Sequence, residues 1–177
     1  MEEKILESII RSQEILRFRL DTGEECEATP VRTDPDGVVY VFIDCLQEEM
    51  HMNPTPTTEG GYKESFLRGY LNNEVLSHFP DELTDNLVPV NEWGDLLTIP
   101  SKAEIFGENG AGPEWPIMKQ RRNRIAFQGL NGQLEWYWLR DPASSTAFAN
   151  VHNYGFCYAY GASNAIGIRP AFKIKNP

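Results

Sequence analysis

Few residues in this sequence combine a side chain and a spacing that would support a chemical reaction. Cys157 and His152 form the closest cysteine–histidine pair along the chain. A thiol next to an imidazole base is the arrangement that nucleophilic catalysis requires. If residues 148–160 fold into a hairpin, the side chains of Cys157 and His152 lie near the same strand end. A catalytic dyad of these two residues is then one interpretation. The alternative is a small buried thiol beside a surface imidazole.

Metal and cofactor sites are not expected. The histidines and cysteines lie at wide spacings that fit neither a zinc site nor a disulfide framework, so we expect reduced thiols. Asp34–Gly37 lacks most ligands of a calcium loop and is interpreted as a turn. Gly107–Gly112 lacks the Lys-Ser/Thr of a phosphate-binding loop. The histidines and cysteines are His51, His78, His152, Cys26, Cys45 and Cys157.

The charge of the chain limits its partners. Acidic residues outnumber basic ones by 26 to 16, which gives a formal charge of −10. This charge repels phosphate backbones, so nucleic acid is not an expected partner. Lys119–Arg124 is a basic stretch, either a phosphate patch or a solvated helix face. Because the start is acidic and no apolar run approaches the ~20 residues of a membrane span, we expect a cytoplasmic protein without membrane contact.

The apolar pattern predicts one α+β domain over residues 1–177, with short antiparallel strands and several short helices. Residues 1–50 are expected to form an N-terminal helix and a small antiparallel sheet. That helix docks on the core or, alternatively, mediates dimerisation. The expected strands are residues 15–20, 25–29, 38–43, 96–99, 134–139, 148–151, 156–160 and 167–174. The expected helices are residues 2–12, 62–71, 74–78, 80–83, 101–106 and 115–125.

Residues 134–139 form the most aromatic of the expected strands. Alternate residues of a strand face opposite sides, so Trp136 and Trp138 share one face and Tyr137 and Leu139 share the other. At least one face packs in the core. Burial of both is favoured because large apolar side chains are usually core residues, while stacking of one face on a ligand such as a sugar ring is the alternative.

Four motifs follow one another in the last two thirds of the chain. They are Gly60-Gly61-Tyr62 with Ser65-x-x-Arg68-x-x-Leu71-Asn72, Leu97-Thr98-Ile99-Pro100-Ser101-x-x-Glu104, Tyr137-Trp138-Leu139-Arg140-Asp141-Pro142, and Gly167-Ile168-Arg169-Pro170-Ala171-Phe172. In this order they resemble a bacterial and prophage-associated family, domain of unknown function 6273, over roughly residues 52–174. The sequence departs from the family at Asp141, where Ser is usual.

The resemblance implies a fold similar to C-type lectins and formylglycine-generating-enzyme-like domains. In that fold the stretch between the two arginine motifs, here residues 143–166, forms a ligand-facing surface. Its composition fits recognition, because Tyr gives contact area at low entropic cost while Asn and Ser give adaptable hydrogen bonds. An ordinary exposed hairpin is the alternative. The predicted ligand-binding residues are His152, Asn153, Tyr154, Tyr158, Tyr160 and Asn164.

The arginines of the last two motifs are expected to be structural. Arg140 and Arg169 lie in apolar strands, where a buried guanidinium needs a carboxylate or several carbonyl partners. Glu104 is the candidate carboxylate, because a capping box places it at the start of a helix. We therefore expect Glu104 within salt-bridge distance of Arg140 or Arg169.

These features favour a non-enzymatic binding module of lectin-like fold, encoded by a phage or prophage and assembled into its particle or kept in the cytoplasm. Its ligand would be a protein or a glycan. The calcium motifs of lectins and the copper-binding cysteines of the formylglycine-generating enzymes are not identifiable, so neither metal is expected. The alternatives are a structural subunit without a small ligand and an enzyme that uses Cys157 and His152. The sequence does not indicate an oligomeric state.

Overall fold

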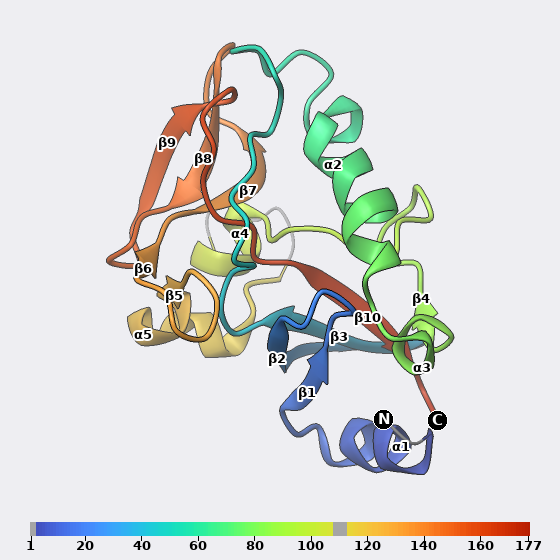
Figure 1. Cartoon of the computed structure of the whole chain (residues 1–177). Coiled ribbons are helices and arrows are strands. Elements are labelled where there is room, and N and C mark those ends of the chain that lie inside the picture. The colour runs from blue at the N-terminus through green and yellow to red at the C-terminus, as the bar shows by residue number, and fades with distance from the viewer. Residues whose placement is uncertain (1–2, 108–112) are drawn as a thin grey trace.

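The computed structural model describes residues 3–107 and 113–177 and has a mixed α+β architecture of antiparallel sheets and short helices (Figure 1). The strands are β1 Leu16–Arg19, β2 Glu25–Asp34, β3 Gly37–Phe42, β4 Leu87–Val88, β5 Ala126–Phe127, β6 Leu134–Glu135, β7 Tyr137–Pro142, β8 Ala147–Val151, β9 Cys157–Gly161 and β10 Ala171–Lys175. The α-helices are α1 Glu3–Ser12, α2 Phe66–Tyr70, α3 Asp81–Thr84, α4 Lys102–Phe106 and α5 Arg121–Arg124. Tighter or wider turns form the 3-10 helices η1 Tyr62–Glu64 and η4 Pro116–Lys119 and the π-helix η2 Leu71–Val75.

The largest sheet joins the two ends of the chain. Its strand order is β1-β2-β3-β10-β4, and all neighbours are antiparallel. The turn predicted at Asp34–Gly37 connects β2 to β3, as expected. β10 pairs with β3 so that Phe172 lies opposite Tyr40. The sheet predicted for residues 1–50 therefore also contains β10, the last strand of the chain, and β4.

The predicted N-terminal helix forms as α1 and packs beside this sheet (Figure 1). Leu6 is buried in the main core with 1% of its surface exposed, whereas Ile5 is 51% exposed. One face of the helix thus docks on the core, as the helical spacing of its apolar residues predicts.

Strand β7 separates two hydrophobic clusters. Trp138 belongs to the cluster that contains Phe42, Phe172 and the helical residue Leu67, and Trp136 packs against the same cluster. Tyr137 and Leu139 belong to the second cluster, together with Ile105 and Trp115. The predicted alternation is correct, and both faces of this strand are buried.

Several predicted elements differ from the structure. Residues 96–99 form no strand, only an isolated bridge between Thr98 and Ala171. The reason is that the Asn72 side chain accepts hydrogen bonds from the backbone N–H groups of Leu96 and Leu97. Residues 115–125 divide into η4 and α5, since Gln120 adopts an extended conformation between them.

The predicted strand 134–139 divides at Trp136, where β6 ends and β7 begins in a different sheet. The backbone N–H of Trp136 bonds to the side chain of Glu135, and its carbonyl accepts from Gly167. Gly167 in turn makes only an isolated bridge to Tyr137, so the predicted final strand starts at Ala171 and not at Gly167.

Candidate functional site

The predicted hairpin at the candidate site forms from β8 and β9. His152 N–H donates to Phe156 O, and Gly155 N–H donates to His152 O at 2.8 Å. Gly155 has a φ of +83°, a conformation that glycine adopts without strain. Arg124 of α5 donates from Nε to Gly155 O at 3.0 Å. The basic stretch that includes Arg124 thus anchors the hairpin turn to the second cluster.

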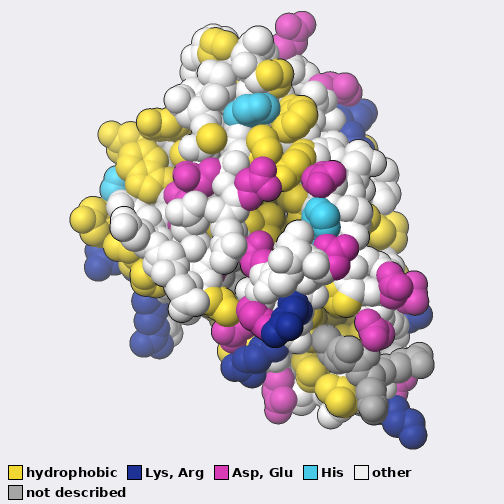
Figure 2. All heavy atoms as spheres, viewed as in Figure 1, with side chains coloured by type: hydrophobic (Ala, Val, Ile, Leu, Met, Phe, Trp, Pro, Cys, Tyr) yellow, Lys and Arg dark blue, Asp and Glu magenta, His cyan; other side chains and the backbone are white. Residues whose placement is uncertain are grey.

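Four of the six predicted ligand-binding residues lie together around Trp136. The His152 ring centroid is 4.3 Å from that of Trp136, and the Tyr158 and Tyr160 centroids are 5.9 and 5.5 Å from it. Tyr154 lies 5.4 Å from His152. We call these five residues the aromatic patch. Hydrophobic side chains gather at the side of the molecule that carries β8 and β9 (Figure 2).

The aromatic patch is open to solvent. Tyr154 and Tyr158 are 58% and 59% exposed, and Tyr160 is 38% exposed. Trp136 and His152 are half-buried, and their rings contact those of the exposed tyrosines. Exposed aromatic rings with polar tips combine apolar contact area with hydrogen-bonding groups.

Asn150 lies on the same sheet face as the aromatic patch. It pairs with Trp138 of β7 on one side and with Tyr158 of β9 on the other. Its side chain is fully buried, yet neither Oδ1 nor Nδ2 has a hydrogen-bond partner. Leaving a buried polar group unpaired costs about 1–3 kcal/mol, so this amide needs an explanation. Asn150 lies within the predicted ligand-facing stretch 143–166, although it is not among the six predicted ligand residues.

Asn153 and Asn164, the other two predicted ligand residues, shape turns. Asn153 is half-buried in the hairpin turn, with a buried Oδ1 that has no partner. Asn164 is exposed and donates from Nδ2 to Gly161 O at 3.2 Å, beyond the far end of β9. Neither side chain takes part in the ring contacts of the aromatic patch described above.

The geometry separates the residues proposed for an enzyme. The His152 ring contacts Trp136 and Tyr158, while strand alternation turns Cys157 toward the opposite face from Tyr158. His152 Nδ1 accepts a hydrogen bond from Tyr154 N–H at 3.3 Å. Cys157 is half-buried, and its Sγ lies 4.0 Å from the Tyr158 carbonyl. The expectation that this thiol is buried is therefore only partly met.

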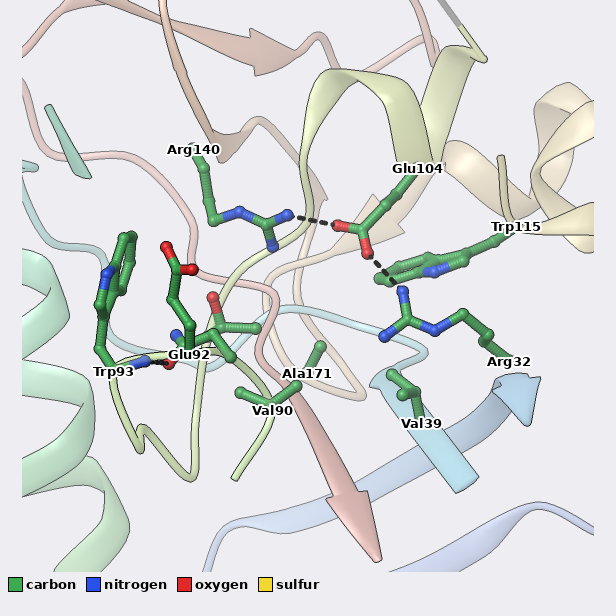
Figure 3. A pocket seen from close by; sticks show the side chains of 11 residues that line it. Arg32, Val39, Val90, Glu92, Trp93, Glu104, Trp115, Arg140 and Ala171 are labelled. Carbon is green, nitrogen blue, oxygen red and sulfur yellow. Dashed lines mark hydrogen bonds and ion pairs between the residues drawn. The ribbon is translucent and has the colours of Figure 1, made fainter. Parts of the chain in front are cut away.

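A cavity elsewhere in the molecule contains the predicted structural residues Glu104 and Arg140. Glu104 Oε1 lies 3.0 Å from Nη2 of Arg140, and Glu104 Oε2 lies 3.4 Å from Nη1 of Arg32 (Figure 3). The predicted capping box is formed, with Ser101 N–H donating to Glu104 Oε1 at 2.8 Å. These groups line a cavity of about 280 Å³ beside Trp115. Figure 3 shows the two guanidinium groups approaching the carboxylate from different sides.

Arg169 does not pair with Glu104 and has carbonyl partners, the second of the two expected arrangements. It is 2% exposed and donates to the carbonyl oxygens of Phe42 and Asn123 and to the Tyr137 hydroxyl, at 2.6, 3.0 and 2.9 Å. Its hydrogen-bond acceptors are therefore all neutral, while the Asp44 carboxylate lies close enough to interact with its charge. The sequence pointed to both arginines, but it did not indicate that they separate.

The ion pairs at the cavity form a chain of balanced charge. Arg32 forms a second pair with Asp34, through Nε to Oδ1 at 2.8 Å. Lys173 then joins Asp34 and Asp36 at 3.2 and 3.0 Å. Each cation near Glu104 has its own carboxylate, and Glu92 adds a further carboxylate to the lining of the cavity. These ion pairs join β2, β7, α4 and β10.

The described part of the chain contains no group of three or more His, Cys, Asp or Glu residues arranged for a metal ion. Within that same part, no helix has the length and apolar composition needed to cross a bilayer.

Comparison with known families agrees with one section of the predicted resemblance. Residues 95–176, less than half of the chain, match the family model described as "Domain of unknown function (DUF6273)". The match includes Glu104, Arg140, Arg169 and the whole hairpin. Neither the search of curated proteins nor the search of solved structures found a match.

Proposed function

We propose that this protein is a non-enzymatic binding module whose ligand surface is the aromatic patch. The observation that carries the proposal is the contact among the five rings of the aromatic patch, Trp136 included, with three tyrosines left exposed. Large exposed aromatic clusters are costly to leave in water and commonly mark interaction sites. The fold similar to C-type lectins and the phage or prophage origin belong to this proposal, as the resemblance implies them.

The local charge supports an uncharged ligand. Residues 143–168 contain no Lys, Arg, Asp or Glu, although 24% of the whole chain is charged. An ionic ligand would find no partner of opposite charge on this hairpin. The net charge of −10 would also repel anionic polymers.

A neutral glycan fits this chemistry better than an apolar peptide. The C–H face of a pyranose ring is apolar and packs on aromatic rings, while its edge carries hydroxyl groups that both donate and accept hydrogen bonds. The unpaired amide of Asn150 would satisfy one hydroxyl as donor and a second as acceptor. Tyr158 stands directly opposite Asn150 in the register of β8 and β9, so the amide is next to the aromatic patch in the sheet.

The test is isothermal titration of the full chain with a panel of neutral oligosaccharides. Tyr158→Ala and Tyr160→Ala are expected to weaken binding by about tenfold or more, because each removes a stacking ring. Leu130→Ala is the matched control, since Leu130 is also exposed but lies outside the aromatic patch. Equal loss in the control, or unchanged binding in both tyrosine variants, would refute the location of the site.

Asn150→Leu tests the polar half of the proposal. It removes an unpaired amide, so the midpoint of thermal unfolding is expected to stay equal or rise, while saccharide binding is lost. A purely structural Asn150 would give the reverse result, with a lower unfolding midpoint. If no saccharide binds but a protein partner is lost with Tyr158→Ala, the aromatic patch is a protein-binding site instead.

A further inference from the structure

The four edges of the two larger sheets differ in how they are protected. β1 exposes Arg17 and Arg19, each paired with a glutamate of β2. β4 contains only two residues. At the edge of β7, Trp138 N–H and Arg140 N–H donate to the carbonyls of Gly167 and Pro100. Charged side chains, short length and covering segments are the devices that keep sheet edges from pairing with other chains.

β9 carries no charged side chain at its edge, although the outward-pointing carbonyl of Gly161 already accepts hydrogen bonds from Asn164. It is the end strand of the order β7-β8-β9 and lies at the margin of the molecule (Figure 1). Its five residues, Cys157–Gly161, include no charged residue and no proline. The charge-free stretch 143–168 extends on both sides of it. An uncharged edge is where a chain of net charge −10 meets least repulsion from a second copy.

The hydrogen-bond register shows which backbone groups point outward. Ala162 N–H donates to Thr146 O and His152 N–H donates to Phe156 O. In this register Tyr158 and Tyr160 exchange hydrogen bonds with β8. The N–H and C=O groups of Ala159, which is exposed, therefore point away from the sheet.

We propose that two copies of this chain associate through antiparallel pairing of their β9 strands about a two-fold axis at Ala159. In this pairing Ala159 faces Ala159 of the second copy and exchanges two hydrogen bonds with it. Tyr158 of each copy then faces Tyr160 of the other, so the two-fold axis creates two tyrosine pairs on one face of the sheet. On the other face Cys157 stands opposite Gly161 of the second copy.

This inference goes beyond the proposed function, since it uses the edge of the strand and not its ring face. It would nevertheless join two aromatic patches into one platform. A five-residue edge buries less than the roughly 1,200 Å² typical of stable complexes, so the dimer is expected to be reversible, with a dissociation constant in the micromolar range. Gly161 O already accepts from Asn164, so the strongest pairing is expected at Ala159.

Sedimentation velocity of the full chain over a concentration series tests the association. The average mass is expected to rise toward that of a dimer. Ala159→Lys should raise the dissociation constant by about tenfold or more, because it puts a charge at the axis. Ala165→Lys is the matched control, since it adds the same charge at an exposed alanine outside β9. A monomer at every concentration, or equal effects of the two variants, would overturn the proposal.

A cross-link tests the register. Gly161→Cys places a thiol opposite Cys157 of the second copy, and mild oxidation should give a covalent dimer on a non-reducing gel. The added Cβ meets only the Asn164 side chain nearby, at 2.8 Å, which can move. Cys157→Ser combined with Gly161→Cys should abolish the cross-link, because Cys26 and Cys45 are buried. A wild-type dimer without this cross-link would assign the interface to another surface.

Discussion

Glu104 Oε1 lies 3.0 Å from Arg140 Nη2, so the carboxylate at the start of α4 meets the arginine of β7. Glu104 is 6% exposed, and its capping box fixes its direction. Arg140 donates in addition to Ile99 O at 2.6 Å. This contact ties the helix to the hairpin sheet through a nearly buried charge, and it forms one wall of the cavity beside Trp115.

Removal of Arg140 tests this link. Arg140→Ala leaves Glu104 buried with a more distant partner, Arg32 at 3.4 Å, and leaves Ile99 O with only the longer bond from Thr98 Oγ1, at 3.4 Å. We expect a loss of about 2–4 kcal/mol in the free energy of unfolding, measured by urea denaturation. Arg17→Ala, which breaks an exposed pair with Glu27, should cost less than about 1 kcal/mol. Similar costs for both would show that burial adds nothing to the Glu104 pair.

Glu135 should make stability depend on pH. Burial raises the pKa of its carboxyl from 4.5 to about 7; the Trp136 N–H bond opposes this shift and nearby Glu49 adds to it. A raised pKa means that the folded state holds the proton more tightly. The stabilisation is therefore complete below pH 4.5 and is lost as the pH rises through 7, by up to about 3 kcal/mol.

Glu135→Gln isolates that effect, because the amide keeps an acceptor for Trp136 N–H and does not ionise. The variant and the wild type should unfold at similar temperatures at pH 4.5. At pH 8 the variant should unfold about 5 °C or more above the wild type. Glu59→Gln, at an exposed site, should leave the pH profile unchanged. Parallel profiles for the wild type and Glu135→Gln would contradict the raised pKa.

The rate of cysteine labelling distinguishes a thiol that is merely exposed to solvent from one that His152 activates. Burial, with nearby Glu24, raises the pKa of Cys26 to about 12, and burial raises that of Cys45 well above its usual value. Cys157 is half-buried, so iodoacetamide should label it first. In a binding module His152→Ala should leave that rate unchanged. A rate above that of an unstructured cysteine peptide, lost in His152→Ala, would support the enzyme alternative.

The helix α1 should contribute stability through one residue. Leu6→Ala removes a fully buried side chain and is expected to cost about 2–5 kcal/mol. Ile5→Ala, on the exposed side of the same helix, should change stability by about 0.5 kcal/mol or less. If Ile5→Ala instead lowers the average mass in sedimentation, the helix mediates dimerisation and β9 does not.

Local patterns were sufficient for much of the fold. The alternation of Trp136, Tyr137, Trp138 and Leu139 predicted which cluster each side chain joins, because successive residues of a strand face opposite sides. The capping box at Ser101 fixed the start of α4, since its hydrogen bonds join neighbours in sequence. The hairpin of β8 and β9 followed from two apolar runs around Gly155.

Only the tertiary structure decided what depends on distant partners. Residues 96–99 do not form the predicted strand because Asn72, far away in sequence, accepts hydrogen bonds from the backbone N–H groups of Leu96 and Leu97. Arg140 and Arg169 looked alike in their motifs, but Arg140 meets a carboxylate and Arg169 meets neutral oxygens. The buried amide of Asn150 and the outward-pointing backbone groups of β9 also depend on the tertiary structure, since solvent exposure and hydrogen-bond register are properties of the whole fold. Sequence by itself determined residue types and local periodicity; packing determined which of those residues meet.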